Sequence, residues 1–213
     1  MNEYEKMHNG LVYDCMDEEI RIEAIRSHKL SDEYNDIKTS EERCNGILKE
    51  LFLGDDFGSF RVMEKPIFID LGKEIKIGKN FYSNKYFSFI GGCHVEIGDN
   101  VIIGPFCTLA TGMHSLIPEE RRMKVDESGK LIDFEFGKPI YIGNDVWIAS
   151  NVTICGGVTI GDGSVIGAGS VVTKDIPKGV LAAGNPCKVI RSITEEDSMY
   201  RKKEKNESKF KWI

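Results

Sequence analysis

The sequence predicts a mainly β protein built as a parallel β-helix of hexapeptide repeats. An aliphatic residue recurs every six positions over residues 142–172, and in most repeats a small residue follows it. The same period is present over residues 97–110. The chain of 213 residues contains 22 glycines but only 6 prolines, a composition that favours many regular turns over disorder. These three observations point to one repetitive β architecture.

The aliphatic positions form a nearly continuous series. They are Ile97, Ile103, Leu109, Ile142, Ile148, Ile154, Ile160, Ile166 and Val172. A six-residue period suits a solenoid in which each hexapeptide makes one short strand and one turn. Three hexapeptides close a triangular coil of about 18 residues, so the aliphatic side chains point inward and stack in roughly five coils. A β-sandwich is disfavoured because its turn signals, about every 8–12 residues, are missing.

Two irregularities interrupt the series. Ile77 precedes Ile97 by 20 positions, which predicts an irregular coil near residues 83–92. The step from Leu109 to Ile142 is 33 positions, which predicts a long charged loop inserted at about 114–138. A long excursion from a rigid solenoid often carries function.

The chain divides into three parts. Residues 1–58 read as a polar helical segment with Ser40 as a helix N-cap. We expect this segment to serve as a lid or a support, and direct contact with the substrate is the alternative. Residues 59–191 carry the β-helix with its inserted loop, and residues 192–213 form a polar tail. Asn185-Pro186 predicts a turn at the end of the solenoid.

Composition excludes several classes of function. The net charge of −6 and the pI of about 5.4 disfavour nucleic-acid binding, which uses a basic face. No apolar run is long enough for a membrane span, and the polar N-terminus does not resemble a secretory signal. The six scattered cysteines form no CxxC pair, which disfavours structural zinc and favours a reduced, cytoplasmic setting.

Several motifs together resemble the galactoside/maltose O-acetyltransferase family of the hexapeptide-repeat superfamily. They are YEKMHNGLVYD, FIDLGKEIKIGKNFYSN, TGMHSLIPEERR, EFGKPIYIGNDVWIASNVTI, GAGSVVTKDIPKGVLAAGNP and NPCKVIR, which span nearly the whole chain. The resemblance implies a left-handed β-helix. It also implies an acetyl-CoA-dependent O-acetyltransferase that uses acetyl-CoA as its acetyl donor and requires no metal.

His114 begins the inserted loop, where the aliphatic rhythm fails and Ser115 occupies an expected aliphatic position. An imidazole suits general-base work near neutral pH. The resemblance implies that His114 takes the proton of an acceptor hydroxyl, which then attacks the acetyl-CoA thioester directly in a ternary complex. It also places Asn84 in the active site, where an amide holds the acceptor or the transition state. Taken without the motif, Asn84 is as well explained as a turn residue.

The resemblance implies further contacts with both substrates. Asp14 and Asp70 match acceptor-binding positions, and as isolated residues both read as solvated carboxylates. Strand alternation points Trp147 outward, either into a subunit interface or against a ligand. For the donor, Ser150 matches the position whose backbone N–H meets the thioester oxygen. The other matched coenzyme A contacts are Ala168, Thr173, Lys174, Lys188 and Arg191.

One departure from the family concerns the acceptor. Gly91 and Gly92 stand where galactoside-acetylating relatives carry an acidic pair, so the acceptor is either a sugar or glycoside hydroxyl or another group, such as an amino sugar or an antibiotic. His94 follows two residues later and reads as an incidental surface histidine more readily than as a replacement contact.

The resemblance also implies a homotrimer with active sites between adjacent subunits, a small-molecule acceptor, and neither nucleic-acid nor membrane partners. A metal-dependent hydratase on the same fold is a competing reading, and it needs three histidines converging on zinc. The chain has only His8, His28, His94 and His114, and the first two fall in the helical segment. A purely structural β-helix is disfavoured by the matched coenzyme A motifs.

Overall fold

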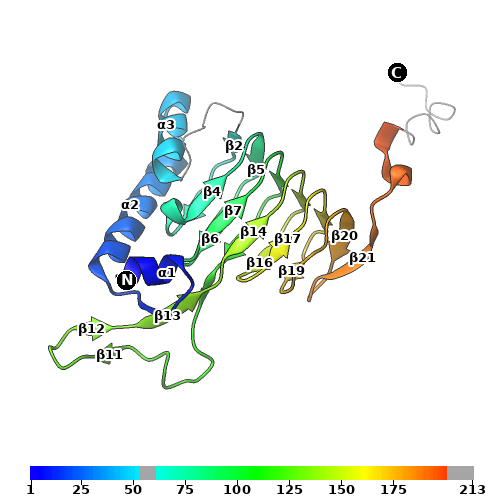
Figure 1. The fold of residues 1–213 in the computed structure, drawn as a ribbon. Helices are drawn as coiled ribbons and strands as arrows, with labels where there is room; N and C mark the ends of the chain where they lie inside the picture. Colours follow the sequence, from blue (N-terminus) through cyan, green and yellow to red (C-terminus); the bar gives the residue numbers. More distant parts are fainter. Residues whose placement is uncertain (53–60, 201–213) are drawn as a thin grey trace.

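A computed structural model describes residues 1–52 and 61–200 of the chain. The predicted boundary at residues 58 and 59, and the part of the predicted tail after residue 200, lie outside the described residues. Three helices come first in the chain and a stack of short strands follows (Figure 1). Among the described residues, no helix is long and apolar enough to cross a membrane.

The helices are α1 (Glu3–His8), α2 (Glu18–Asn35) and α3 (Glu41–Leu51). Ser40 is the N-cap of α3, as predicted, and its hydroxyl accepts a hydrogen bond from the Arg43 N–H. Asn2 and Asp17 cap α1 and α2 in the same way. The long helices α2 and α3 lie across the first coils of the strand stack, at the end opposite β21 (Figure 1).

The predicted left-handed parallel β-helix is confirmed, with three stacked faces. Face 1 contains β4 (Ile75–Ile77), β7 (Val95–Ile97), β14 (Ile140–Ile142) and β17 (Thr159–Ile160). Face 2 contains β2 (Arg61–Met63), β5 (Phe81–Ser83), β8 (Ile102–Ile103), β15 (Trp147–Ile148), β18 (Val165–Ile166) and β20 (Val180–Ala183). Face 3 contains β3 (Ile67–Ile69), β6 (Phe87–Ile90), β9 (Thr108–Ala110), β16 (Thr153–Cys155) and β19 (Val171–Val172).

The register confirms the predicted stacking of aliphatic residues. Ile142 pairs with Ile160, and Ile148 pairs with Ile166, which are steps of 18 positions. These inward side chains are fully or almost fully buried, and burying one aliphatic side chain contributes about 1.5–3 kcal/mol. Larger side chains fill the first coils, where Phe81, Phe87 and Phe89 are inaccessible to solvent.

The first coils differ from the prediction in where they are irregular. Their register steps by 20 positions, as in the Ile77–Ile97 pair, but β5 and β6 themselves are regular strands. The additional residues fall at the corner between faces 3 and 1, in segments 70–74 and 90–94. The first segment contains a 3-10 helix, η1 (Gly72–Glu74), and the second bends through Gly91 at a φ of +109°.

The inserted loop leaves from the same corner. It contains β10 (Gly112–Met113), β11 (Lys124–Val125), β12 (Leu131–Ile132) and β13 (Phe134–Gly137). The β11–β12 hairpin projects away from the stack, below α1 in Figure 1. Strand β13 pairs antiparallel with β10 on one side and with β1 (Tyr13–Asp14) on the other.

The last coil ends at β20, and Asn185-Pro186 lies in the turn before β21 (Lys188–Ser192). Strand β21 runs antiparallel to β20 and is exposed along its whole length. A second 3-10 helix, η2 (Glu195–Asp197), follows β21. The solenoid therefore closes with a hairpin at the end remote from the helices.

Candidate active site

The candidate base His114 lies directly after β10, on the three-stranded sheet β1-β13-β10. The pairs Gly112–Gly137 and Met113–Phe136 fix the chain immediately before the histidine. The pair Tyr13–Glu135 ties the same sheet to the N-terminal segment. The His114 side chain is 58% exposed, so the candidate base stands at an open surface directly after a paired strand.

Glu135 is the acidic neighbour of His114. Its Oε1 atom lies 3.7 Å from Nε2 of His114, and its Oε2 atom accepts a hydrogen bond of 3.0 Å from the buried Tyr13 hydroxyl. Burial and the Glu135 carboxylate raise the pKa of Tyr13, so the phenol remains a donor. Burial, together with Glu135 and two neighbouring aspartates, also raises the pKa of Cys15 to about 12. The carboxylate is therefore surrounded by protonated groups and is itself held in place.

This arrangement can orient an imidazole for proton transfer. A carboxylate beside Nε2 favours the tautomer that carries its proton on that atom, which leaves Nδ1 free to accept another proton. A base oriented by a third group is a recurring arrangement where a nucleophile is activated. Sequence reasoning missed both Glu135 and Tyr13. The sequence offered one signal for Glu135. It is a charged residue between Phe134 and Phe136, close to the point where the inserted loop rejoins the solenoid.

Asp14 lies on β1 of this sheet and is only 5% exposed. Its Oδ1 atom accepts hydrogen bonds from the backbone N–H groups of Asp133 and Met16, and its Oδ2 atom lies 3.1 Å from Nζ of Lys130. Burial opposes ionisation of this carboxyl, but these donors outweigh it and lower the pKa of Asp14. The residue thus fastens the returning arm of the loop to the N-terminal segment.

Asp70 lies at the corner between faces 3 and 1 and keeps an exposed carboxylate. Oδ2 accepts a hydrogen bond from the Gly91 N–H, and Oδ1 lies 3.1 Å from Nε2 of His28 in α2. Gly91 in turn packs against the backbone of Gly112, two residues before His114. Asp70, Gly91 and Gly112 therefore rise along one corner, which we call the insert corner, toward the candidate base.

Gly91 and Gly92, where the chain differs from the expected acidic pair, leave no empty space around them. A Cβ at Gly91 would overlap the backbone of Gly112. A Cβ at Gly92 would lie 2.6 Å from Sδ of Met7 and 2.9 Å from the Tyr13 hydroxyl. The N-terminal segment thus occupies the volume that a side chain at position 92 would need.

A second group of predicted residues lies at the corner between faces 2 and 3. This Asn84 corner consists of Asn84, Gly104, Ser150 and Ala168, stacked coil upon coil. In one chain, strand β6 separates Asn84 from Gly91 at the insert corner, and its four residues extend for about 13 Å. The structure therefore places Asn84 and His114 at different corners of one subunit.

Apolar side chains are exposed beside the Asn84 corner. Trp147 is 52% exposed on face 2 and pairs in register with the exposed Ile102. Tyr86 and Phe106 stack at the corner itself, with their ring centroids 4.5 Å apart. Such a cluster is unusual on a free surface and suits an interface.

The remaining predicted residues lie further along the solenoid. Thr173 and Lys174 are exposed on the last turn of the insert corner, and Lys188 is exposed on β21. Arg191, also on β21, forms a bidentate ion pair of 2.7 Å with Asp197. Ser150 and Ala168 are both exposed, so all the candidate coenzyme A contacts are accessible in a single chain.

His94 differs from the predicted surface histidine. It is half-buried, and its Nδ1 atom is buried without a hydrogen-bond partner among the described residues. The ring centroid of His8 is 5.4 Å away, although the two residues are 86 positions apart in sequence. The docking of α1 against the insert corner brings them together, and sequence spacing carried no signal for this contact.

Two family models match the chain. The maltose acetyltransferase hexapeptide capping motif matches residues 6–54, and the bacterial transferase hexapeptide model of six repeats matches residues 139–174. The first match covers the helical segment, and the second covers the later coils of the β-helix.

Known proteins resemble the chain over almost its full length. Galactoside O-acetyltransferase of Escherichia coli is 41% identical, over 92% of each chain. The crystal structure of a maltose O-acetyltransferase from Clostridium difficile is 40% identical with a TM-score of 0.78, over 92% of this chain and 99% of the other. A hexapeptide-repeat acetyltransferase of Vibrio cholerae, solved with acetyl coenzyme A, is 34% identical with the same TM-score, over 92% of this chain and 100% of the other.

Proposed function

The chain belongs to the galactoside/maltose O-acetyltransferase family, and we propose that it transfers the acetyl group of acetyl-CoA to a hydroxyl of a sugar or glycoside. The observation that carries this proposal is the His114–Glu135 pair on a rigid arm at the insert corner. Relatives of this family act on carbohydrate hydroxyls or were solved with acetyl-CoA, which supports both halves of the reaction.

His114 acts as the general base. With its Nε2 proton directed at Glu135, the Nδ1 atom takes the proton of the acceptor hydroxyl as the oxygen attacks the thioester carbonyl carbon. The tetrahedral intermediate then collapses, the carbon–sulfur bond breaks, and the coenzyme A thiolate recovers the proton from the imidazolium. Both substrates are bound together, so proximity supplies much of the acceleration and no acetyl-enzyme forms.

The oxyanion of the intermediate is stabilised by the backbone N–H of Ser150. Loss of one such donor typically costs about 3–4 kcal/mol of transition-state stabilisation. Asn84, on the same corner, holds the acceptor or the transition state by its neutral amide. Both residues lie at the Asn84 corner, whereas the base lies at the insert corner.

The division between corners supports a site shared by two subunits. We assign His114, Asp70 and Lys174 to one subunit and Asn84 with Ser150 to its neighbour in a cyclic trimer. The exposed cluster of Trp147, Ile102, Tyr86 and Phe106 borders the Asn84 corner and suits this interface. We therefore assign Trp147 to the subunit interface. The edge of its indole ring can also contact the substrate.

Acceptor binding is assigned to Asp70, whose exposed carboxylate can accept sugar hydroxyls. Asp14 is assigned an indirect part, because its oxygen atoms already accept bonds from the loop and the N-terminal segment. The filled space at Gly92 favours a second candidate acceptor class, an amino sugar or an antibiotic hydroxyl, since no acidic side chain stands there.

Donor binding is assigned to the lower coils. Ala168 and Thr173 line the path of the pantetheine arm, and Lys174, Lys188 and Arg191 attract the phosphates of coenzyme A. Lys188 offers a point charge in place of a guanidinium fork, so it contacts a phosphate through single hydrogen bonds. All six cysteines are unpaired, which supports a cytoplasmic enzyme in a reduced compartment.

A thiol-release assay tests the proposal. Purified trimer is mixed with acetyl-CoA and, in parallel, with galactosides, maltose and glucose, amino sugars, and hydroxyl-bearing antibiotics. Acceptor-dependent release of coenzyme A with a sugar or glycoside supports the primary assignment, and release only with the other panel members selects the second candidate. Retention of full turnover by His114→Ala would reject the assigned base.

A further inference from the structure

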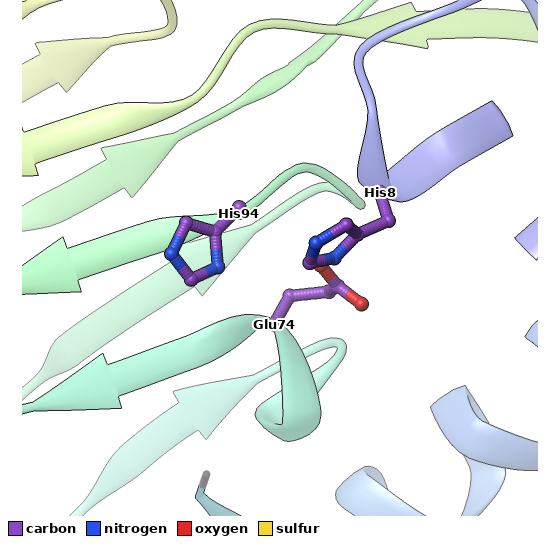
Figure 2. A group of neighbouring side chains, drawn as sticks. All are labelled: His8, Glu74 and His94. Atoms are coloured by element: carbon purple, nitrogen blue, oxygen red, sulfur yellow. The ribbon is translucent and has the colours of Figure 1, made fainter. Parts of the chain in front are cut away.

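A cluster of three potential metal ligands lies beside the insert corner, on the side facing α1. His8 comes from the end of α1, Glu74 from η1 in the first coil, and His94 from the equivalent segment of the next coil (Figure 2). Each side chain offers one ligand atom, and these atoms lie within 4.8 Å of one another. Nδ1 of His8 and Oε2 of Glu74 are already 2.8 Å apart.

The cluster contains a buried atom that could bind a metal ion and has no hydrogen-bond partner among the described residues. Glu74 is 1% exposed, so its carboxylate is buried beside the partly exposed His8. A ring nitrogen of His94 faces His8 and Glu74 in Figure 2, and its Nδ1 atom is buried without a partner among the described residues. An unpaired buried nitrogen costs free energy that a ligand bond recovers.

The charges around the cluster favour a cation. The Glu74 carboxylate is buried against the His8 imidazole, whose ring centroid lies 5.4 Å from that of His94. An anionic oxygen ligand beside two imidazoles is a combination that divalent transition metals bind. Glu96, two residues after His94, has its carboxylate paired with Lys76.

We propose that His8, Glu74 and His94 bind a divalent transition-metal ion of the zinc class, which fastens α1 to the first two coils. Two imidazoles and one carboxylate are a ligand set for Zn²⁺, Co²⁺ or Ni²⁺, whereas Ca²⁺ and Mg²⁺ prefer all-oxygen sites. Ligands about 2.0–2.2 Å from a tetrahedral ion lie about 3.3–3.6 Å apart, so side-chain movements of up to about 1.5 Å close the site. Water completes the coordination on the exposed side of His8.

A second cluster, Cys15 with Asp133 and Glu135, has similar spacing but does not suit this role. Burial and the surrounding carboxylates raise the pKa of its thiol, and Glu135 is already bonded to Tyr13 and close to His114. The proposed ion is therefore structural, at a place separate from the His114–Glu135 pair, and acetyl transfer does not pass through it.

The test uses the purified protein in its native assembly, freed of metal by chelation and dialysis. Isothermal titration with Zn²⁺ is expected to give one ion per subunit, and Co²⁺ is expected to give the visible absorption of a nitrogen- and oxygen-ligated ion. At Zn²⁺ about 100-fold above its Kd, the midpoint of thermal unfolding should rise by roughly 5–10 °C and return after EDTA.

Three variants locate the ion. His8→Gln and His94→Gln should each weaken Zn²⁺ binding by more than the roughly 10–100-fold typical of losing an outer-shell partner. His28→Gln, which removes a histidine paired with Asp70 outside the cluster, is the matched control and should bind as wild type. Because each variant is compared with and without metal, a loss of metal-free stability does not obscure the result. Failure of the wild type to bind, or binding unchanged in His8→Gln and His94→Gln, would overturn the site, and neither outcome bears on acetyl transfer.

Discussion

Nε2 of His114 lies 3.7 Å from Oε1 of Glu135, and the same carboxylate accepts a hydrogen bond from the buried Tyr13 hydroxyl. The pair joins two strands of the inserted loop, and Tyr13 joins them to the N-terminal segment. The relationship makes Glu135 a candidate positioning residue for the assigned base, and it ties that pair to β1 of the N-terminal segment.

The first prediction concerns this pair. His114→Ala should lower kcat by about 100- to 10,000-fold, the usual contribution of a general base. Glu135→Gln should lower kcat by about 100-fold through misplacement of the imidazole, with little change in the KM of either substrate. Steady-state thiol release measures both. A Glu135→Gln variant with unchanged kcat and raised KM would show that the carboxylate binds substrate instead.

The second prediction concerns the Asp14 anchor. Asp14→Asn should destabilise the protein by about 1–3 kcal/mol, because donors around a buried carboxylate lose their charged acceptor. Lys130→Met, which removes only the more exposed partner, should cost less. Urea unfolding of the purified protein at fixed concentration measures both. Equal effects of the two substitutions would mean that the ion pair, and not the backbone donors, holds the loop.

Asp14 also predicts a dependence on pH. Its pKa is lower in the folded protein than its ordinary value, so the unfolded chain binds the proton more readily. The stability that this carboxylate contributes is present above about pH 4 and is lost as the pH falls through the folded pKa. Unfolding midpoints between pH 3 and 6 should therefore fall less steeply for Asp14→Asn than for wild type. A parallel fall in both proteins would contradict this.

The third prediction concerns the glycine at the family departure. Gly92→Ala should cost about 1–3 kcal/mol, because the added Cβ overlaps Met7 and Tyr13. Gly46→Ala, in the interior of α3 with room for a Cβ, is the control and should stabilise the protein by roughly 1 kcal/mol. Thermal unfolding compares the two, and a neutral Gly92→Ala would show that the N-terminal segment adjusts freely.

The fourth prediction concerns the subunit interface. Trp147→Glu should dissociate the trimer and abolish turnover, because it places a charge in the exposed apolar cluster beside the Asn84 corner. Ile37→Glu, at an isolated position that is 93% exposed, should leave the trimer intact. Sedimentation velocity at micromolar concentration reports the mass. An intact trimer in Trp147→Glu would move the interface elsewhere.

The fifth prediction concerns the donor phosphates. Asp197 holds Arg191 in a bidentate pair, so it competes with any phosphate for the guanidinium. Asp197→Asn should lower the KM for acetyl-CoA by about two- to fivefold, and Arg191→Ala should raise it. An unchanged KM in Arg191→Ala would remove this residue from the donor site.

The solenoid could be predicted from the sequence because the residues of its stacked core are regularly spaced along the chain. The inward residues from Ile142 to Val172 recur every six positions, one third of a coil, so the residues that pair 18 positions apart can be counted from the sequence. The position of the additional residues in the first coils was harder to predict from the sequence. Segments 70–74 and 90–94 are recognised as the same corner of successive coils only once the strands are paired.

The candidate site residues that the sequence offered, such as His114 and Asn84, all came from family motifs, and their roles stay predictions. Glu135 was missed because its contacts with His114 and Tyr13 arise from the antiparallel pairing of β1, β13 and β10, across more than 100 residues of sequence. His8 and His94 were missed for the same reason, since the docking of α1 depends on tertiary packing that leaves no period in the chain.

The central claim is that each site combines His114 of one subunit with Asn84 of its neighbour, and mixed trimers test it most directly. His114→Ala and Asn84→Ala chains, each inactive alone, are unfolded together in equal amounts and refolded. In a random cyclic trimer about one site in four receives both intact residues, so about a quarter of wild-type acetyl transfer should return. Mixed trimers that remain as inactive as either parent would contradict the shared site.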